Sequence, residues 1–158
     1  MDFEALYAIF DGFELENFLP ELDSLLGWVE TLLRIAVMAG PLMLLGFGLV
    51  YLLAPPKEAN HSAGYRFWWG MASLEAWQFT QRTAGIGWTA LGTVLTIVMA
   101  VLCNGFRGME AMDMAWLAVK CIGWQIGLTV LCCLTIDVLV IIAFDRYGYR
   151  RGSYDEYE

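Results

Sequence analysis

Residues 116–144, WLAVKCIGWQIGLTVLCCLTIDVLVIIAF, form a long apolar run that decides how the chain must fold. A helix crosses the hydrocarbon core of a bilayer with about 20 mostly apolar residues, because each residue adds about 1.5 Å. This run meets that requirement, and so do residues 35–54 and 85–103. The whole chain is 59% hydrophobic and 16% charged, against roughly 25% charged in a soluble domain. The sequence therefore predicts an all-α integral membrane protein with three transmembrane helices.

The negative charge of the protein is concentrated at one end of the chain. The formal net charge is −8, and eight carboxylates precede the first basic residue, Arg34. From residue 31 onward, nine acidic residues balance nine basic ones. We therefore divide the chain into an acidic leader, residues 1–30, and a three-span membrane domain, residues 31–158. The deficit of basic residues argues against nucleic acid as a partner, since phosphates require a basic surface.

The acidic leader contains two stretches with amphipathic helical spacing. Apolar residues recur at i, i+3, i+4 and i+7 over residues 3–10, and similarly over residues 22–33. Asp11-Gly12 and Pro20 separate the two stretches, so we expect two short amphipathic helices at the membrane interface. The leader then either caps the outer mouth of the bundle or serves as a docking surface for a basic partner or another membrane subunit.

Three prolines constrain the first span and the residues after it. Pro41 lacks a backbone N–H and leaves a carbonyl of the preceding turn without its helical partner. In lipid, a neighbouring helix or a water must satisfy this carbonyl, and we expect a kink near residues 35–41. Pro55-Pro56 ends the helix, because proline disfavours helical geometry in the residue before it.

Lysine and arginine near the span ends predict the orientation in the membrane. The segment 55–84 and the C-terminal tail hold six basic residues, whereas the opposite side holds three. Cytoplasmic loops carry the excess of Lys and Arg in multi-pass membrane proteins. We therefore expect a multi-pass protein of the cell membrane, with its N-terminus outside and its C-terminus in the cytoplasm.

The segment between the first two spans, residues 55–84, is dense in Trp, Tyr and Phe among Arg and Glu. Aromatic rings with polar groups belong at the headgroup level of a bilayer, which predicts an interfacial segment on the cytoplasmic side. Ser73 can cap a helix that begins near Leu74. Glu75 lies in the first turn of that helix, where the helix dipole favours an anion, and the helix continues toward the second span.

A set of residues in this segment has a characteristic spacing. Its members are Asn60, Gly64, Tyr65, Arg66, Met71, Glu75, Trp77 and Gly85. In this pattern the chain resembles, over about residues 54–100, the SdpI family of bacterial membrane proteins, which are immunity proteins against a sporulation-delaying toxin. One departure is Phe67-Trp68, which stands where the family has Thr-Pro and a tight turn is expected.

The resemblance implies a three-span module that works by binding, without catalysis or a cofactor. By resemblance, protection comes from binding the toxin peptide in the membrane, through the spans and the outer face. Signal relay comes from sequestering a cytoplasmic regulator through the loop around Arg66 and Trp77. The acidic leader has no counterpart in the family.

The residue types of this set have individual physical roles. Gly64 permits a bend with positive φ, and Tyr65 can anchor at the interface. Arg66 supplies a planar fork of five donors, and we expect it to pair with Glu75 if the segment folds back on itself. Arg66, Glu75 and Trp77 form either a structural clasp or a surface that engages a peptide, a lipid headgroup or a cytoplasmic partner.

Asp137 is an ionisable residue within the third span. Such a group faces the bundle interior or water and needs a partner. Arg66, Arg82 or His61 can reach it from the cytoplasmic loop. Alternatively, the span slides outward and Asp137 becomes interfacial. Its role is either that of a structural ion pair or that of a functional carboxylate.

The cysteines and the histidine favour a protein without catalytic or metal chemistry. The four cysteines lie in or beside apolar runs, which predicts buried thiols, with a Cys103–Cys121 disulfide as the alternative. His61 is the only histidine, so a multi-histidine metal site is excluded, and no common catalytic motif occurs. Two other functions stay open: an accessory subunit of a larger membrane complex, and a small membrane enzyme or lipid-binding protein that uses Glu75, Asp137 and His61.

Overall fold

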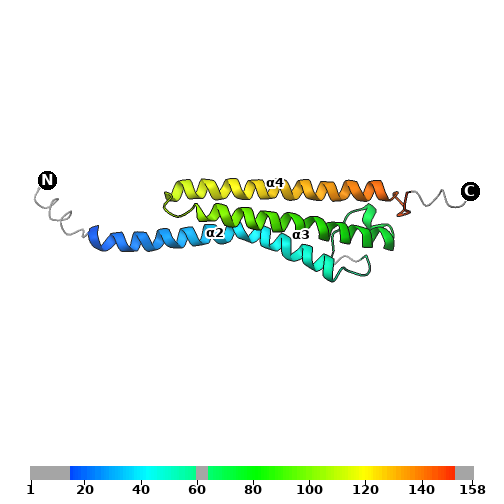
Figure 1. The fold of residues 1–158 in the computed structure, drawn as a ribbon, viewed down its shortest axis with the longest axis horizontal. Coiled ribbons are helices and arrows are strands. Elements are labelled where there is room, and N and C mark those ends of the chain that lie inside the picture. The colour runs from blue at the N-terminus through cyan, green and yellow to red at the C-terminus, as the bar shows by residue number, and fades with distance from the viewer. Residues whose placement is uncertain (1–14, 60–63, 152–158) are drawn as a thin grey trace, which may run out of the picture.

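The computed structural model describes residues 15–59 and 64–151, with side chains described from Leu25 onward. In this part of the chain, three long helices and one short 3₁₀ helix follow one another (Figure 1). They are α2 (Leu15–Leu53), η1 (Trp69–Met71), α3 (Leu74–Asn104) and α4 (Ala111–Ala143). Residues Leu25–Leu53 of α2, and the whole of α3 and α4, are long and apolar enough to cross a membrane. The predicted all-helical membrane fold is confirmed.

The helices begin before the predicted spans and end within one residue of them, because capping and turn residues decide where a helix begins and ends. α3 begins at Leu74, well before residue 85, since the Ser73 side chain accepts a hydrogen bond from the Ala76 N–H at 3.1 Å. The cap predicted at Ser73 is therefore present. α2 ends at Leu53, just before Pro55-Pro56, as expected.

Helices α2 and α3 form the most extensive contact of the bundle, and α4 packs on both. Small residues allow α2 and α3 to approach closely. A Cβ added at Gly85 would lie 3.0 Å from the Leu52 side chain, and one at Gly92 would lie 2.6 Å from the Leu45 backbone nitrogen. Glycines at a helix crossing are typical of membrane bundles, where close packing rather than the hydrophobic effect holds helices together.

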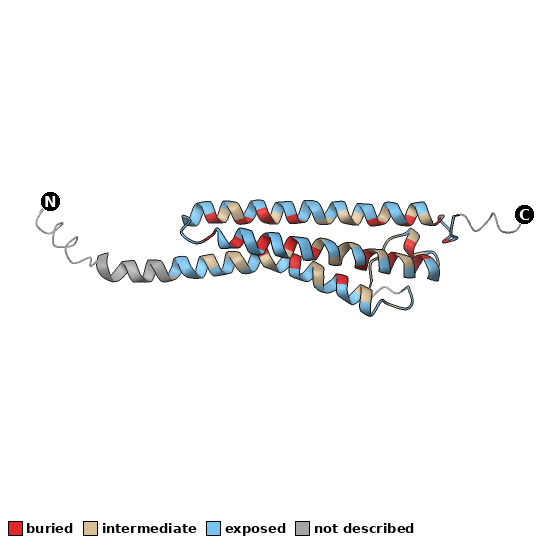
Figure 2. Cartoon of the chain, viewed as in Figure 1, coloured by how far each residue is buried: buried red, intermediate tan, exposed pale blue. Residues whose placement is uncertain are grey.

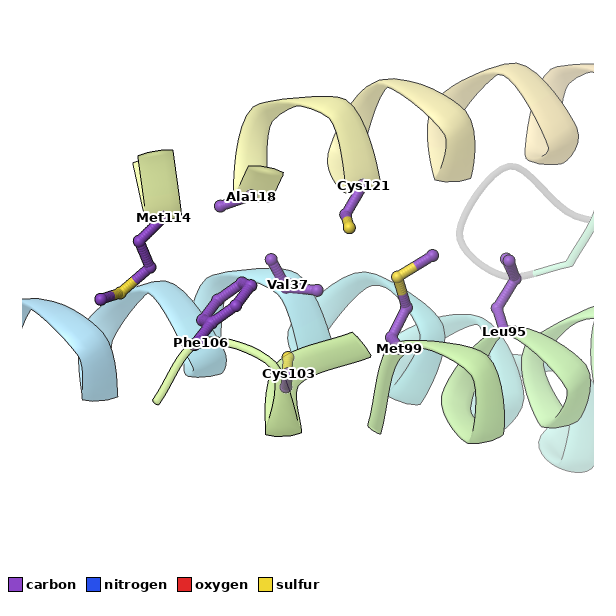
Figure 3. Close-up of a cluster of buried hydrophobic side chains, with 8 residues drawn as sticks. All are labelled: Val37, Leu95, Met99, Cys103, Phe106, Met114, Ala118 and Cys121. Atoms are coloured by element: carbon purple, nitrogen blue, oxygen red, sulfur yellow. The ribbon is translucent and has the colours of Figure 1, made fainter. Parts of the chain in front are cut away.

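A cluster of buried side chains joins the three helices near the turn between α3 and α4 (Figure 3). Its members are Val37, Leu95, Met99, Cys103, Phe106, Met114, Ala118 and Cys121. All four cysteines are free thiols. Cys103 and Cys121 are buried, as predicted, whereas Cys132 and Cys133 are half-buried, and the alternative disulfide between Cys103 and Cys121 is not formed.

Most of the surface of each helix is exposed, and buried residues form narrow stripes along the helices (Figure 2). Many exposed side chains are large and apolar, for example Val94, Leu131 and Ile142. Large exposed apolar surfaces are unfavourable in water but suit contact with lipid. The distribution of burial thus agrees with a bundle surrounded by a bilayer.

Pro41 has the structural consequence that the sequence predicts. Its missing N–H leaves the carbonyl of Val37, four residues earlier, without a helical partner. Gln125 of α4 donates from Nε2 to this carbonyl at 3.0 Å, and Gln125 itself is buried. Figure 1 shows that α2 changes direction in its second half. A side chain of one helix thus completes the backbone hydrogen bonding of another.

The leader differs from the two separate amphipathic helices that we expected. α2 runs from Leu15 through Pro20 and into the first span without interruption. A proline removes one helical hydrogen bond, and outside the hydrocarbon core water can satisfy the freed carbonyl, so the helix continues. The break predicted at Pro20 is therefore wrong. The first expected helix, over residues 3–10, lies outside the described residues.

Replacing Gln125 by Leu should lower the free energy of unfolding in detergent micelles by about 1–2 kcal/mol, because the Val37 carbonyl loses its donor. The same replacement in a Pro41→Ala background should cost much less, since alanine restores a backbone N–H for that carbonyl. Circular dichroism during chemical unfolding measures both losses. Equal losses in the two backgrounds would contradict this account.

Candidate functional site

The segment that follows α2 folds back onto the first turns of α3. Trp77 of α3 is fully buried, and its indole Nε1 donates to the Pro56 carbonyl at 2.8 Å. Because Pro56 comes just after α2, this bond ties the end of the first span to the start of the next helix. Trp77 is therefore an internal anchor of the fold rather than an exposed interfacial ring.

Gly64 gives the segment the bend that the sequence predicts. Its φ is +112°, a conformation that residues with a Cβ rarely adopt. A Cβ at this position would also lie 2.7 Å from the Trp77 ring. Glycine is thus required at residue 64 both for backbone conformation and for packing.

The side-chain amide of Gln81 holds the next residue by two hydrogen bonds. The Tyr65 N–H donates to Gln81 Oε1 at 2.7 Å, and Gln81 Nε2 donates to the Tyr65 carbonyl at 2.8 Å. Gln81 is fully buried and Tyr65 is half-buried, so both bonds are partly shielded from water. The amide therefore satisfies both backbone polar groups of a residue that belongs to no helix.

The side chain of Tyr65 reaches across the bundle to α4. Its hydroxyl donates to Asp137 Oδ1 at 2.8 Å and lies 3.2 Å from the Cys133 carbonyl. Its ring packs edge-on against Trp88, with ring centroids 5.6 Å apart. Burial and the hydrogen bond to Asp137 raise the pKa of the Tyr65 phenol, so the hydroxyl stays protonated and acts as the donor.

These contacts form a clasp that shares only Trp77 with the predicted one. We call its residues, Tyr65, Trp77, Gln81 and Asp137, the clasp. Trp77 and Gln81 hold the segment on α3, and the bond from Tyr65 to Asp137 fastens it to α4. The clasp therefore connects all three spans at one end of the bundle.

Asp137 does not have the partner that we expected. The predicted partners were Arg66, Arg82 and His61. The observed donor is the Tyr65 hydroxyl, and neither arginine forms an ion pair with Asp137, whereas His61 lies outside the described residues. The Tyr65 hydroxyl is neutral and sits on a rigid ring that the two bonds from Gln81 hold in place. It can therefore reach α4 at a point where a charged arginine side chain would lose hydration at a high cost. Asp137 is half-buried, and its role here is to accept a hydrogen bond within the clasp.

Glu75 also pairs differently from the prediction. Its carboxylate lies 3.6 Å from the Arg150 guanidinium, and about 60% of each side chain is exposed. The expected pair of Arg66 and Glu75 is therefore wrong. The reason is tertiary, because the chain after α4 turns back toward the start of α3, where Ser73 Oγ donates to the Gly148 carbonyl at 2.7 Å.

A short helix follows the clasp segment where the Thr-Pro turn was expected. Phe67 and Trp68 lead into η1, and the Met71 N–H donates to the Phe67 carbonyl at 3.1 Å. A Cβ at Gly70 would come too close to the Thr80 side chain of α3, so glycine is required there. The turn thus forms without Thr-Pro, by packing directly on α3.

The remaining family-pattern residues fall into three groups. Gly85 is buried at the crossing of α2 and α3, and Met71 is half-buried in η1. Arg66 is exposed beside the clasp. Asn60 lies outside the described residues, as does His61, which is not part of the pattern.

The sequence reading missed Gln81 and Gly70. A polar amide one turn after Trp77, on the same helical face, was the signal for Gln81, since residues four apart on a helix are neighbours. Gly70 carried no comparable signal, because its requirement comes from a contact with Thr80 that only the folded chain makes.

The fold and the clasp define a multi-pass helical membrane protein whose first loop is fastened to its spans. The model of the SdpI/YfhL protein family matches residues 56–144, more than half of the chain, and the chain belongs to this family. The match contains all four residues of the clasp and the whole of α3 and α4. No curated protein matches the chain, and no solved structure matches it.

Gly64→Ala and Gly108→Ala should have different costs, although both glycines have positive φ. Nothing lies within 4 Å of a Cβ at Gly108, so that variant should lose only about 1 kcal/mol from backbone strain. Gly64→Ala should lose about 3 kcal/mol, because the added methyl group also displaces Trp77. Thermal unfolding in detergent compares the two, and similar losses would show that the contact with Trp77 is unimportant.

Tyr65→Phe should lower the free energy of unfolding by about 1–2 kcal/mol, because Asp137 loses its hydrogen-bond donor. Tyr149→Phe is the matched control, since the Tyr149 ring is exposed and its hydroxyl lies outside the clasp. Asp137→Asn should retain most of the stability, because an amide oxygen still accepts from Tyr65. A Tyr65→Phe variant as stable as the control would argue against the clasp.

Proposed function

We propose that the protein is an immunity protein of the bacterial plasma membrane, which binds a membrane-active toxin peptide, relays its presence and catalyses no reaction. The observation that carries this proposal is the family match over residues 56–144, which coincides with the part of the chain that the clasp organises. Immunity and relay require binding surfaces rather than reacting groups. The following surfaces support both.

A groove between the spans offers a contact surface for an apolar peptide. It lies beside Pro41, has a volume of about 460 Å³, and is bordered by all three long helices. Gln125 is among the few polar residues in its lining. Helices associate in lipid through close packing, so an apolar segment of a toxin can bind here without leaving the bilayer.

The loop side of the clasp supplies a surface for a cytoplasmic regulator. Trp68 has 83% of its surface exposed, and Arg66 is exposed two residues before it. Trp77 is fully buried, so we now propose Arg66 and Trp68 as the relay surface in place of Arg66 and Trp77. The clasp fastens this surface to α4. A shift in the packing of the spans can therefore move the loop through the contacts of the clasp.

The proposed orientation keeps the loop and the C-terminal end in the cytoplasm. Both lie at the same end of the bundle in Figure 1. Six of the nine Lys and Arg residues belong to these two segments. The positive-inside bias supports this orientation, with the acidic leader outside.

An accessory subunit of a larger complex is the second candidate function. One observation favours it: α2 extends past α3 and α4 at its N-terminal side (Figure 1). In the N-terminal half of α2, Leu25, Trp28 and Leu32 have 59%, 68% and 61% of their surfaces exposed. Purification from the native membrane in mild detergent separates the candidates, because an accessory subunit copurifies with a stoichiometric partner and an immunity protein does not.

Expression of the protein in a bacterium sensitive to a sporulation-delaying toxin should restore growth in the presence of the toxin. Gln81→Leu should reduce this protection strongly at equal protein level in the membrane, because the Tyr65 backbone loses both bonds to the amide. Growth curves with purified toxin, together with immunoblots of membranes, make the measurement.

Tyr149→Phe is the control for this assay and should protect like the native protein. Absence of protection by the native protein, when it is present in the membrane, would contradict the immunity proposal. Full protection by Gln81→Leu would leave immunity standing but remove the clasp from its mechanism.

A further inference from the structure

A hollow of about 510 Å³ lies between the end of α2 and the first turns of α3. Its lining has two different sides. We call the polar lining residues, Lys57, Gln78 and Arg82, its polar side, and Tyr51, Leu52 and the two prolines that follow α2 its apolar side. Neither the clasp nor the groove beside Pro41 includes the polar side of this hollow.

The hollow lies at the depth where the hydrocarbon of a bilayer meets the headgroups. Leu52 packs against Gly85, where the apolar part of α3 begins. Arg82 is about one helical turn before Gly85, so it lies just outside that apolar part. In a bilayer that α2 and α3 cross, the apolar side of the hollow is therefore level with the acyl chains and its polar side with the headgroups.

The polar side carries a net positive charge. Lys57 and Arg82 are both exposed, and no carboxylate lines this hollow. On α3, two turns before Arg82, Glu75 forms an ion pair with Arg150. Glu58, which follows Lys57 in the chain, does not line the hollow. Among the described residues, no carboxylate lies within ion-pair distance of Lys57 or Arg82.

We propose that this hollow binds an anionic phospholipid, with its phosphate between Lys57 and Arg82 and an acyl chain along Tyr51 and Leu52. The planar guanidinium of Arg82 suits two-point contact with phosphate oxygens, and Lys57 adds a second charge. Gln78 supplies a neutral donor or acceptor for the polar part of the headgroup. This inference goes beyond the proposed function and requires only that α2 and α3 cross the bilayer.

A lipid in this hollow would also reinforce the clasp. Pro56 lines the hollow, and its carbonyl accepts the hydrogen bond from Trp77. The phosphate would bridge Lys57, which follows α2, and Arg82 of α3. The hydrogen bond from Trp77 to Pro56 joins the same two segments of the chain. Bound phospholipid should therefore raise the thermal stability of the protein as well as occupy the surface.

The test uses the whole protein in neutral detergent with added phosphatidylglycerol or phosphatidylcholine. Native mass spectrometry counts the retained lipid, and thermal unfolding reports the stabilisation. The double variant Lys57→Gln/Arg82→Gln should bind phosphatidylglycerol about thirtyfold more weakly than the native protein, since each cation near an anionic surface contributes to affinity. Phosphatidylcholine binding should be weak for both proteins.

The matched control is Arg107→Gln/Lys120→Gln, which removes one arginine and one lysine that are exposed near the opposite end of the bundle. This control should retain phosphatidylglycerol like the native protein. Equal losses in the two double variants, or no loss in either, would overturn the proposal. The exchange Lys57→Arg/Arg82→Lys should keep most of the binding, because the charges remain.

Inorganic phosphate distinguishes a lipid site from a general anion site. It should neither stabilise the protein nor displace phosphatidylglycerol at a matched concentration, because it cannot contact the apolar side. Stabilisation by phosphate equal to that by phosphatidylglycerol would overturn the assignment to lipid. If the double variant does not fold, Arg82→Gln alone is measured and interpreted by the same criteria.

Discussion

The two hydrogen bonds between the Gln81 amide and the Tyr65 backbone support the whole loop end of the structure. Tyr65 belongs to no helix, so its N–H and carbonyl need partners from elsewhere in the chain. Gln81 is fully buried and Tyr65 is half-buried, and a polar group left unsatisfied on burial is costly. Gln81 satisfies both groups and fixes the direction of the Tyr65 side chain. The bond to Asp137, and with it the contact between the loop and α4, depends on that direction.

The same constraint operates in the middle of the bundle, where Gln125 satisfies the Val37 carbonyl that Pro41 leaves unpaired. In both places a buried glutamine completes the backbone of another segment. Each bond also joins elements that are distant in sequence. The backbone polar groups therefore obtain their hydrogen-bond partners only when the tertiary structure forms. In a membrane bundle, such bonds provide specific connections between spans, whereas apolar contacts alone permit sliding.

Local features of the site were predictable from the sequence, and the choice of partners was not. The positive φ of Gly64, the cap at Ser73 and the orphaned carbonyl before Pro41 follow from the chemistry of one residue and its near neighbours. The partners of Glu75 and Asp137 were predicted wrongly, because both depend on where distant segments meet. Arg150, for example, reaches Glu75 only because the chain turns back after α4.

The sequence by itself determined that the chain is an all-helical membrane protein with three spans, because runs of about 20 apolar residues have no stable alternative to a helix in lipid. It also determined the family, because the characteristic spacing of these residues can be recognised in the sequence alone. Only the tertiary structure decided that Trp77 is internal, that Tyr65 rather than an arginine reaches Asp137, and that Lys57 and Arg82 border one hollow. Periodicity reports which side of a helix is apolar, but the partner that covers each polar group is decided by how the helices cross.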